Sequence, residues 1–349
     1  MKNGINVLSL FDGLSCGNIA LEKAGIKVNN YYASEIDKWA IQIANKNYPN
    51  IIQLGDVTKF DETQLPKIDL LIGGSPCQGF SFAGKQLNFD DPRSKLFFVY
   101  VYMLKQLKPK YFLLENVRMS KQSQDVISEH LGVQPIKINS SLVSAQNRVR
   151  LYWTNIPNVT QPTDKGLKLK DILEIDGYVD RDKSHCLDAN YFKGGNLKSY
   201  FEKHRRQLVF SNDGLCHVGN ADLNGHDLIK RVYHPDGKAP TVNTMNGGNR
   251  EPKVLCGALR GRYKANGKTE QQLELRKDSK TNSLTTVQKD NLVIEEEQLT
   301  YRKLTPLECE RLQTIPDGYT SGVSNSQRYR MLGNSWTANI IAHLFKGIK

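Results

Sequence analysis

The sequence predicts an α/β protein in which a doubly wound, mainly parallel sheet is joined to a second, smaller, loop-rich β domain. The first 150 residues alternate short apolar runs with amphipathic stretches, which is typical of βαβ units. Residues 158–300 are rich in glycine, asparagine and lysine and lose helical periodicity, which returns from residue 305 onward. A length of 349 residues suits one large domain and one small one.

Five apolar runs and three amphipathic stretches define the first region. We expect strands at 6–10, 31–35, 51–54, 69–72 and 111–115. We expect helices at 17–24, 38–47 and 95–107, and Gly25 and Pro49 are stop signals for the first two. Two further runs, 135–143 and 149–154, predict a hairpin added to the parallel sheet.

The last part of the chain returns to helical patterns at 305–313 and 335–345. Thr305 and Pro306 suit the N-cap and first turn of a helix. We expect these helices to pack back onto the first domain. One domain is therefore predicted from 1–157 plus 325–349, and a second from 158–324.

Charge favours a polyanionic partner. The formal net charge is +12, and neutralised phosphates release counterions that drive association with nucleic acid. Many basic proteins bind no nucleic acid, so charge alone leaves both interpretations open.

The cysteines and the apolar runs point to the cytoplasm. Six cysteines are scattered without a CxxC pair, so neither a disulfide framework nor a zinc ribbon is expected, and no metal site is predicted. No run approaches the roughly 18 apolar residues that span a bilayer, and the start carries no signal-peptide pattern.

Polar residues follow the first three expected strands, at the edge where doubly wound sheets bind ligands. The first is followed by FDGLSCG (11–17), whose glycines allow a ligand to approach a helix start. Glu35 can accept hydrogen bonds from two ribose hydroxyls, Asp56 can accept one from an adenine amino group, and Phe11 can stack on the adenine. Taken singly, each acid is more often a solvated loop residue than a ligand-binding one.

The segment GGSPCQGFS (73–81) directly follows a buried-looking strand. An isolated cysteine is often a small core residue, but Cys77 lies between Pro76 and Gly79 in a polar loop, which is a poor place to fill a core. Cys77 is therefore predicted to be a nucleophile.

Five motifs now give a specific resemblance. SPCQGFS (75–81) is similar to the catalytic motif of the C5 DNA cytosine methyltransferases. FDGLSCG (11–17), ENV (115–117), QNRVR (146–150) and GNSW (333–336) resemble four further motifs of that family, in the same order. The resemblance covers residues 5–154 and 302–345 and leaves the middle as a variable target-recognition region.

The resemblance implies a Rossmann-like methyltransferase that uses S-adenosylmethionine. The Cys77 thiolate would add to carbon 6 of a flipped-out cytosine in a specific duplex DNA sequence, so that carbon 5 can take the methyl group. Glu115 would donate a proton at N3, and the paired arginines Arg148 and Arg150 complete the catalytic set, with Arg150 stabilising charge at O2. Arg150 would also raise the thiolate fraction of Cys77.

The same resemblance and the loop positions assign two further sets of residues. The cofactor set is Phe11, Gly13, Leu14, Gly17, Glu35, Ile36, Asp56, Val57, Pro76, Leu96, Asn334, Ser335 and Trp336. The DNA-contact set is Gln78, Ser81, Lys85, Arg205, Arg206, Arg260 and Arg262. Two positions depart from the commonest family pattern, Ser15 where glycine is frequent and Trp336 where valine is usual.

The implied biology is DNA modification by a cytoplasmic, nucleoid-associated monomer. The partner is double-stranded DNA, within a restriction-modification or phage protection system in which a cognate endonuclease would act separately. Three alternatives stay open: an RNA cytosine-5 methyltransferase on the same fold, a dinucleotide-binding oxidoreductase, and a catalytically silent DNA-binding protein. The long region between the arginine and closing motifs argues against the first, and Cys77 with Glu115 argues against the second. Every reactive position of the motif set is filled, which argues against the third.

Overall fold

The structure is a computed structural model. It describes residues 4–75, 95–174, 177, 179–194, 200, 203–211, 217–220, 231–233, 253–254, 256–263, 269–276, 291–293 and 300–349. The described chain forms two compact units, Met1–Ile175 with Val179–Leu208 and Lys303–Lys349, and Asp176–Tyr178 with Val209–Arg302. No helix in the described part of the chain is long and apolar enough to cross a membrane.

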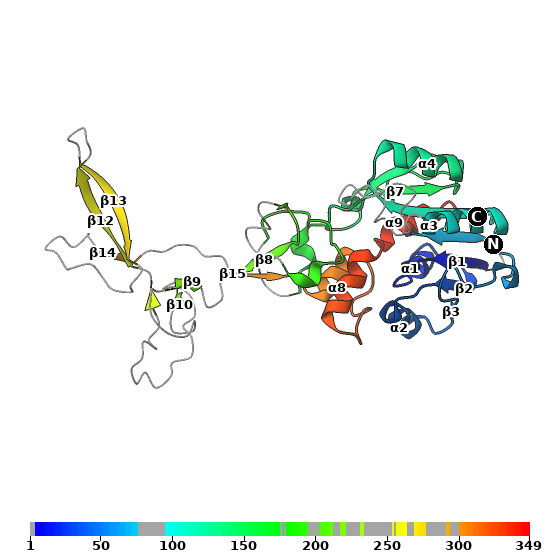
Figure 1. Cartoon of the computed structure of the whole chain (residues 1–349), viewed down its shortest axis with the longest axis horizontal. Helices are drawn as coiled ribbons and strands as arrows, with labels where there is room; N and C mark the ends of the chain where they lie inside the picture. The colour runs from blue at the N-terminus through cyan, green and yellow to red at the C-terminus, as the bar shows by residue number, and fades with distance from the viewer. Residues whose placement is uncertain are drawn as a thin grey trace. The chain divides into compact units, whose positions relative to one another are not determined.

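A seven-stranded sheet organises the first unit, with the order β3-β2-β1-β4-β5-β7-β6 (Figure 1). The strands are β1 Ile5–Leu10, β2 Val28–Ser34, β3 Ile52–Gln53, β4 Leu70–Gly73, β5 Tyr111–Val117, β6 Ile136–Asn139 and β7 Val149–Thr154. The first five are parallel, whereas β7 is antiparallel to both β5 and β6. The doubly wound, mainly parallel sheet and its added hairpin are confirmed.

Helices cover both faces of this sheet. The described helices of this unit are α1 Cys16–Lys23, α2 Lys38–Asn47, α3 Lys95–Leu107, α4 Lys121–Leu131, α7 Pro306–Leu312, α8 Asn325–Asn334 and α9 Ala338–Phe345, with short 3₁₀ turns at Glu62–Gln64, Ser140–Leu142, Leu169–Ile172 and Tyr191–Lys193. Because side chains alternate along a strand, Leu70 and Ile72 pack with α1 and α9, while Leu71 packs with α3 and α4. The core thus has two layers.

The C-terminal helices belong to the first unit, as expected. In Figure 1 the red α9 lies beside the blue α1, and these two helices pack together. Thr305 caps α7 in a reciprocal capping box, with its hydroxyl accepting from the Glu308 amide and the Glu308 carboxylate accepting from the Thr305 amide. Pro306 occupies the first turn, where no amide donor is needed.

The second unit is built of short strands, in keeping with the predicted small β domain. They are β8 Leu208–Ser211, β9 His217–Asn220, β10 Arg231–Tyr233, β11 Lys253–Val254, β12 Cys256–Tyr263, β13 Thr269–Arg276, β14 Asn291–Val293 and β15 Thr300–Lys303. They pair as β11-β10-β9, β13-β12-β14 and β15-β8. This unit is shorter than 158–324, and the assignment of 158–324 to target recognition stays a prediction.

Each expected strand and helix of the first region is present, with ends within three residues of the prediction. Two helices of the described chain were missed, α4 and α8, because their sequences KQSQDVISEHL and NSQRYRMLGN are mostly polar and contain few apolar residues. The second strand of the hairpin matches Val149–Thr154, whereas the first ends at Asn139 because a 3₁₀ turn follows.

The capping box yields a stability test. Thr305→Ala removes the acceptor for the Glu308 amide and should lower the free energy of unfolding by about 1 kcal/mol. Thr305→Ser keeps the hydroxyl and is the matched control, expected within about 0.5 kcal/mol of wild type. Urea unfolding followed by circular dichroism measures both, and equal loss in the two variants would contradict a role for the cap.

A cavity at the carboxyl edge of the sheet

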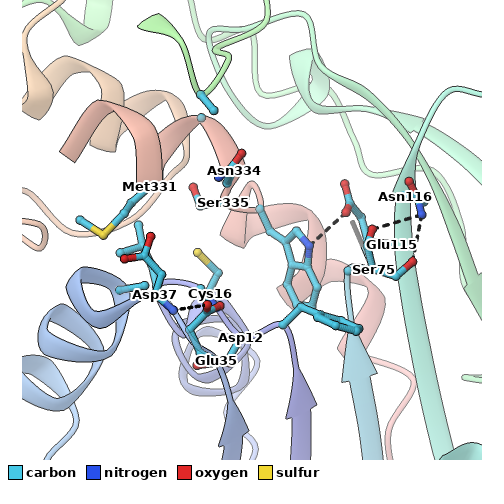
Figure 2. Close-up of a pocket in the computed structure, with 18 of the residues that line it drawn as sticks. Asp12, Cys16, Glu35, Asp37, Ser75, Glu115, Asn116, Met331, Asn334 and Ser335 are labelled. Atoms are coloured by element: carbon cyan, nitrogen blue, oxygen red, sulfur yellow. Dashed lines mark hydrogen bonds between the residues drawn. The ribbon is translucent and has the colours of Figure 1, made fainter. Parts of the chain in front are cut away.

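A cavity of about 570 Å³ lies where strands β1, β2, β4 and β5 end (Figure 2). Its lining comes from the turns after these strands, from residues 55–57 after β3, from the starts of α2 and α3, and from the two arginines Arg148 and Arg150. Residues 186–189 and several residues of 331–336 complete it. All of these segments belong to the first unit. Ligands of doubly wound sheets bind at this edge, so the cavity is the leading candidate for the functional site.

The turn after β1 is held in an unusual backbone conformation. Phe11, Gly13 and Ser15 all have positive φ, at 58°, 59° and 55°. Glycine adopts this region freely, but the other two residues do so at a cost. The conformation brings Asp12, between them, into the cavity lining.

Asp12 is a functional candidate that sequence reasoning missed. Its carboxylate accepts hydrogen bonds from the Ser15 hydroxyl and, at 2.7 Å, from the Tyr31 hydroxyl. Burial raises the pKa of Asp12 from 3.8 to about 6, against the opposing effect of these hydrogen bonds. Ser15, a departure from the commonest family pattern, thus supplies a partner to this carboxylate.

Glu35 and Asp56 both line the cavity. The Glu35 carboxylate accepts backbone hydrogen bonds of 2.8 Å from Gly13, Ile36 and Asp37, which fix its position. Asp56 accepts from the backbone amide and the hydroxyl of Thr58, and these hydrogen bonds lower its pKa. Asp37 is a third acidic neighbour, and it caps α2 through the Trp39 amide.

Apolar side chains supply much of the remaining wall. Phe11, Leu14, Ile36, Val57 and Leu96 all line the cavity, and Ile36 is 76% exposed. Gly13, Asn334, Ser335 and Trp336 also line it. An exposed isoleucine at a cavity mouth is available to a ligand with an apolar face.

Gly17 is the one described member of the predicted cofactor set that is absent from the lining. A Cβ atom at Gly17 would lie 2.3 Å from Ile72 Cδ1 and 2.7 Å from the Tyr31 hydroxyl. The glycine therefore allows α1 to approach the sheet closely, which is a packing requirement.

At the other end of the cavity, Glu115 is held on both sides. Its Oε1 lies 3.0 Å from Nε of Arg150, and its Oε2 accepts a hydrogen bond of 3.1 Å from the indole Nε1–H of Trp336. The β5–β7 register explains the first contact, since Glu115 pairs with Tyr152 and Val117 pairs with Arg150. Glu115 and Arg150 are diagonal neighbours on one face of the sheet.

The adjacent Asn116 connects this end to the segment that contains Cys77. Its side-chain amide donates to the backbone oxygen and the hydroxyl of Ser75, at 3.4 and 3.3 Å. Both residues are buried, with 1% and 4% of their surface exposed. Asn116 therefore fixes the chain immediately before Pro76.

Arg148 also lines the cavity, but its guanidinium donates its hydrogen bonds to backbone oxygens of the protein. It donates to the backbone oxygens of Leu187, Gly333 and Ser335 at 2.9, 3.2 and 2.8 Å. Only 3% of its surface is exposed. These bonds join β7 to two other segments of the cavity wall.

Two thiols line the described cavity, and their environments differ. Burial raises the pKa of Cys16 to about 12, which keeps it protonated. Burial would also raise the pKa of Cys186, but the neighbouring guanidiniums of Arg148 and Arg150 outweigh it and lower that pKa. Sequence reasoning missed the 186–189 wall because a Cys–Leu–Asp–Ala stretch carries no ligand motif.

The remaining predicted residues are placed as follows. Pro76, Cys77, Gln78, Ser81 and Lys85 lie outside the described residues. Arg205 forms an ion pair of 2.8 Å with Asp188, and Arg206 donates to the backbone oxygen of Gly194. Arg260 and Arg262 lie on β12, where their backbones pair with Gln272 and Glu270.

The first unit has an α/β fold of the Rossmann-like type, with a cavity of small-molecule size at the carboxyl edge of its sheet. The chain belongs to the C-5 cytosine-specific DNA methylase family, whose model matches residues 5–349. It is accordingly a DNA (cytosine-5-)-methyltransferase, its substrate is DNA, and members of its family use S-adenosylmethionine.

Relatives are similar to the chain along almost all of its length. An orphan methyltransferase of Bacillus phage rho11s, M.Rho11sI, is 28% identical over 98% of this chain and 97% of its own. The type II methyltransferase M.HhaI of Haemophilus parahaemolyticus is 26% identical over 98% and 93%. The solved structure of the Entamoeba histolytica methyltransferase EhMeth shares the fold, with a TM-score of 0.61, 16% identity and 99% coverage of each chain.

Asp12 predicts a pH dependence of stability. Its pKa is about 6 in the fold and 3.8 ordinarily, so its contribution is fully present below pH 3.8 and lost as pH rises through 6. The free energy of unfolding of wild type minus that of Asp12→Asn should fall by about 2–3 kcal/mol between pH 4 and 7. Urea unfolding at each pH measures it.

The surface variant Asp125→Asn, on α4, is the control for this measurement. It removes a carboxylate from the surface, so a pH effect shared by both variants would reflect the loss of charge and not the buried site. A flat difference for Asp12→Asn would show that the buried carboxyl does not titrate in this window.

Proposed function

We propose that this enzyme binds S-adenosylmethionine in the acidic part of the cavity and methylates a flipped-out cytosine of duplex DNA with Cys77 as its nucleophile. The observation that carries the proposal is the arrangement of Glu115, Arg150 and Trp336 in the same cavity as Asp12 and Glu35. One cavity thus offers carboxylates to a cationic methyl donor and a carboxylate–guanidinium pair to a nucleobase.

The donor set fits S-adenosylmethionine. Asp12, Glu35, Asp37 and Asp56 line one part of the cavity and complement a positively charged sulfonium compound. The volume of about 570 Å³ lies in the range of small-molecule sites. When bound, S-adenosylmethionine supplies the methyl group. We assign Glu35 to the ribose hydroxyls, and Phe11 and Ile36 to the adenine.

The other part of the cavity suits a cytosine ring. Addition of a thiolate at carbon 6 builds negative charge toward N3 and O2 of the base. Glu115 holds a proton at N3, and the Arg150 guanidinium stabilises the charge near O2. We assign Arg148 to positioning of the wall, because its donors are used by backbone oxygens.

Duplex DNA is the substrate form that we propose. The chain carries a net charge of +12, and residues 158–324 supply the recognition region, with Arg205, Arg206, Arg260 and Arg262 as candidate contacts. We further propose a monomeric cytoplasmic enzyme that protects DNA from a separate endonuclease, in line with the phage orphan and type II names of its relatives.

The nucleophile is tested by substitution. Cys77→Ser should reduce methyl transfer from labelled S-adenosylmethionine to DNA by at least about 10³-fold, because the serine hydroxyl is a far weaker nucleophile. Binding of S-adenosylmethionine, measured by calorimetry, should stay within about threefold of wild type. DNA carrying 5-fluorocytosine at the target should trap a covalent complex with wild type only.

Cys186→Ser is the matched control, because it removes a thiol that lines the described cavity and whose pKa the neighbouring arginines lower. It should retain transfer and trapping. If Cys77→Ser stayed active and Cys186→Ser lost trapping, the nucleophile assignment would be wrong. Transfer to tRNA with none to duplex DNA would favour the RNA enzyme instead.

The cofactor assignment is tested at Glu35. Glu35→Ala removes the carboxylate that the surrounding backbone amides hold in place, and the dissociation constant for S-adenosylmethionine should rise about 10- to 100-fold. Glu22→Ala, an exposed glutamate on α1 bonded to Tyr48, is the control and should leave it unchanged. Equal affinities in calorimetric titrations of both variants would refute the assignment.

A further inference from the structure

Trp336 makes a contact with Glu115 that packing alone does not require. Its indole Nε1–H donates to Glu115 Oε2 at 3.1 Å, while Arg150 Nε lies 3.0 Å from Oε1. Both oxygens of the carboxylate therefore have a partner on the protein. The Glu115 side chain is 11% exposed, so water contributes little to holding it.

We propose that Trp336 is a positioning residue for the methyl-transfer reaction, whose indole N–H fixes the orientation in which Glu115 meets the cytosine. The inference rests on the proposed role of Glu115. The contact of Arg150 with Oε1 restricts the last torsion of Glu115 only loosely, because this terminal torsion is broad and a single donor leaves the carboxylate some rotational freedom. The second donor removes this freedom, and a carboxyl group placed in advance needs no reorganisation when it contacts the base.

The backbone on each side of Trp336 is anchored, which makes the indole a rigid donor. The Ser335 oxygen accepts a hydrogen bond of 2.8 Å from Arg148, and the Ser335 amide donates to Met331. Thr337 is 2% exposed, and its hydroxyl donates to Gln313 at 3.1 Å. The indole itself packs against the core layer of α1 and α9.

Gly74 leaves room for this hydrogen bond. A Cβ atom at Gly74 would lie 3.0 Å from Trp336 Nε1 and 3.3 Å from Glu115 Oε2, that is, against both atoms of the bond. Glycine at this position therefore lets the tryptophan reach the carboxylate. The hydrogen bond thus depends on three segments: Gly74 directly after β4, Glu115 on β5 and Trp336 in the turn before α9.

Trp336→Phe tests the proposal, because it keeps an aromatic ring and removes the N–H donor. The single-turnover rate of methyl transfer to duplex DNA should fall about tenfold, the effect of losing one hydrogen bond to a charged group. The dissociation constants for S-adenosylmethionine and for DNA should stay within about threefold. A raised dissociation constant for S-adenosylmethionine with an unchanged rate would overturn the proposal, since the ring would then serve the cofactor.

Trp153→Phe is the matched control. It also loses an indole hydrogen bond, here to the Ser128 hydroxyl at 2.9 Å, but in the other core layer and outside the cavity lining. Its single-turnover rate should stay within about twofold of wild type. An equal slowing of both variants would overturn a specific role for Trp336.

A double-mutant cycle separates positioning from general disturbance. In a Glu115→Gln background, followed over hours, Trp336→Phe should slow transfer by less than about twofold, because the group it positions is already altered. A full tenfold further loss would overturn the proposal.

If wild type transferred no methyl group, or Glu115→Gln were as fast as wild type, the proposed function or the role of Glu115 would fail. An active wild type, a slow Glu115→Gln and a fast Trp336→Phe would reject the role of Trp336 alone.

Discussion

The end of the cavity that contains Glu115 and Arg150 depends on the direction in which β7 enters the sheet. Because β7 runs antiparallel to β5, Arg150 at its start lies across from the end of β5, where Glu115 is. A parallel strand would bring its own carboxyl end to this edge instead. The same reversal places Arg148 where its guanidinium reaches the oxygens of Gly333 and Ser335. One strand therefore supplies the carboxylate's partner and anchors the turn that carries Trp336.

This anchoring joins segments that are far apart in sequence. Arg148 is buried, and a buried guanidinium is tolerated only when its donors are satisfied. Its partners are the backbone oxygens of Leu187, Gly333 and Ser335, so the cavity wall and the cation stabilise each other. If the C-terminal segment were removed, Arg148 would lose the backbone oxygens of Gly333 and Ser335 as hydrogen-bond acceptors. The second unit interrupts the first in sequence, and the C-terminal part of the first unit is required to complete the cavity wall.

Much of the fold was predictable because its signals are local. Helix α2 ends before Pro49 and α3 is strongly apolar, and both matched the prediction at each end. Helices α4 and α8 were missed because their stability comes from packing of a few residues, such as Ile127 and Leu332, on a polar background.

Site residues were predictable only where they belong to a motif with a known chemical role or stand at the end of a predicted strand. Glu115, Arg150 and Glu35 belong to recognisable motifs or strand ends, and all three line the cavity. Asp12 was missed because nothing local shows that a left-handed turn brings it into the lining. The roles of Gly17 and Arg148 depend on neighbours distant in sequence, which spacing alone does not encode.

The turn after β1 holds an unfavourable backbone arrangement in the wall of the proposed cofactor site. Left-handed backbone at Phe11 and Ser15 costs about 1–2 kcal/mol for each residue, and burial of the Asp12 carboxyl adds a further cost when it ionises. Hydrogen bonds from Tyr31 to Asp12 and from Gly13 to Glu35 offset part of this. A cationic ligand in the proposed cofactor site would favour the ionised carboxyl and offset more, so ligand binding and the stability of this turn would be coupled. The strain is therefore located where the proposed ligand can relieve it.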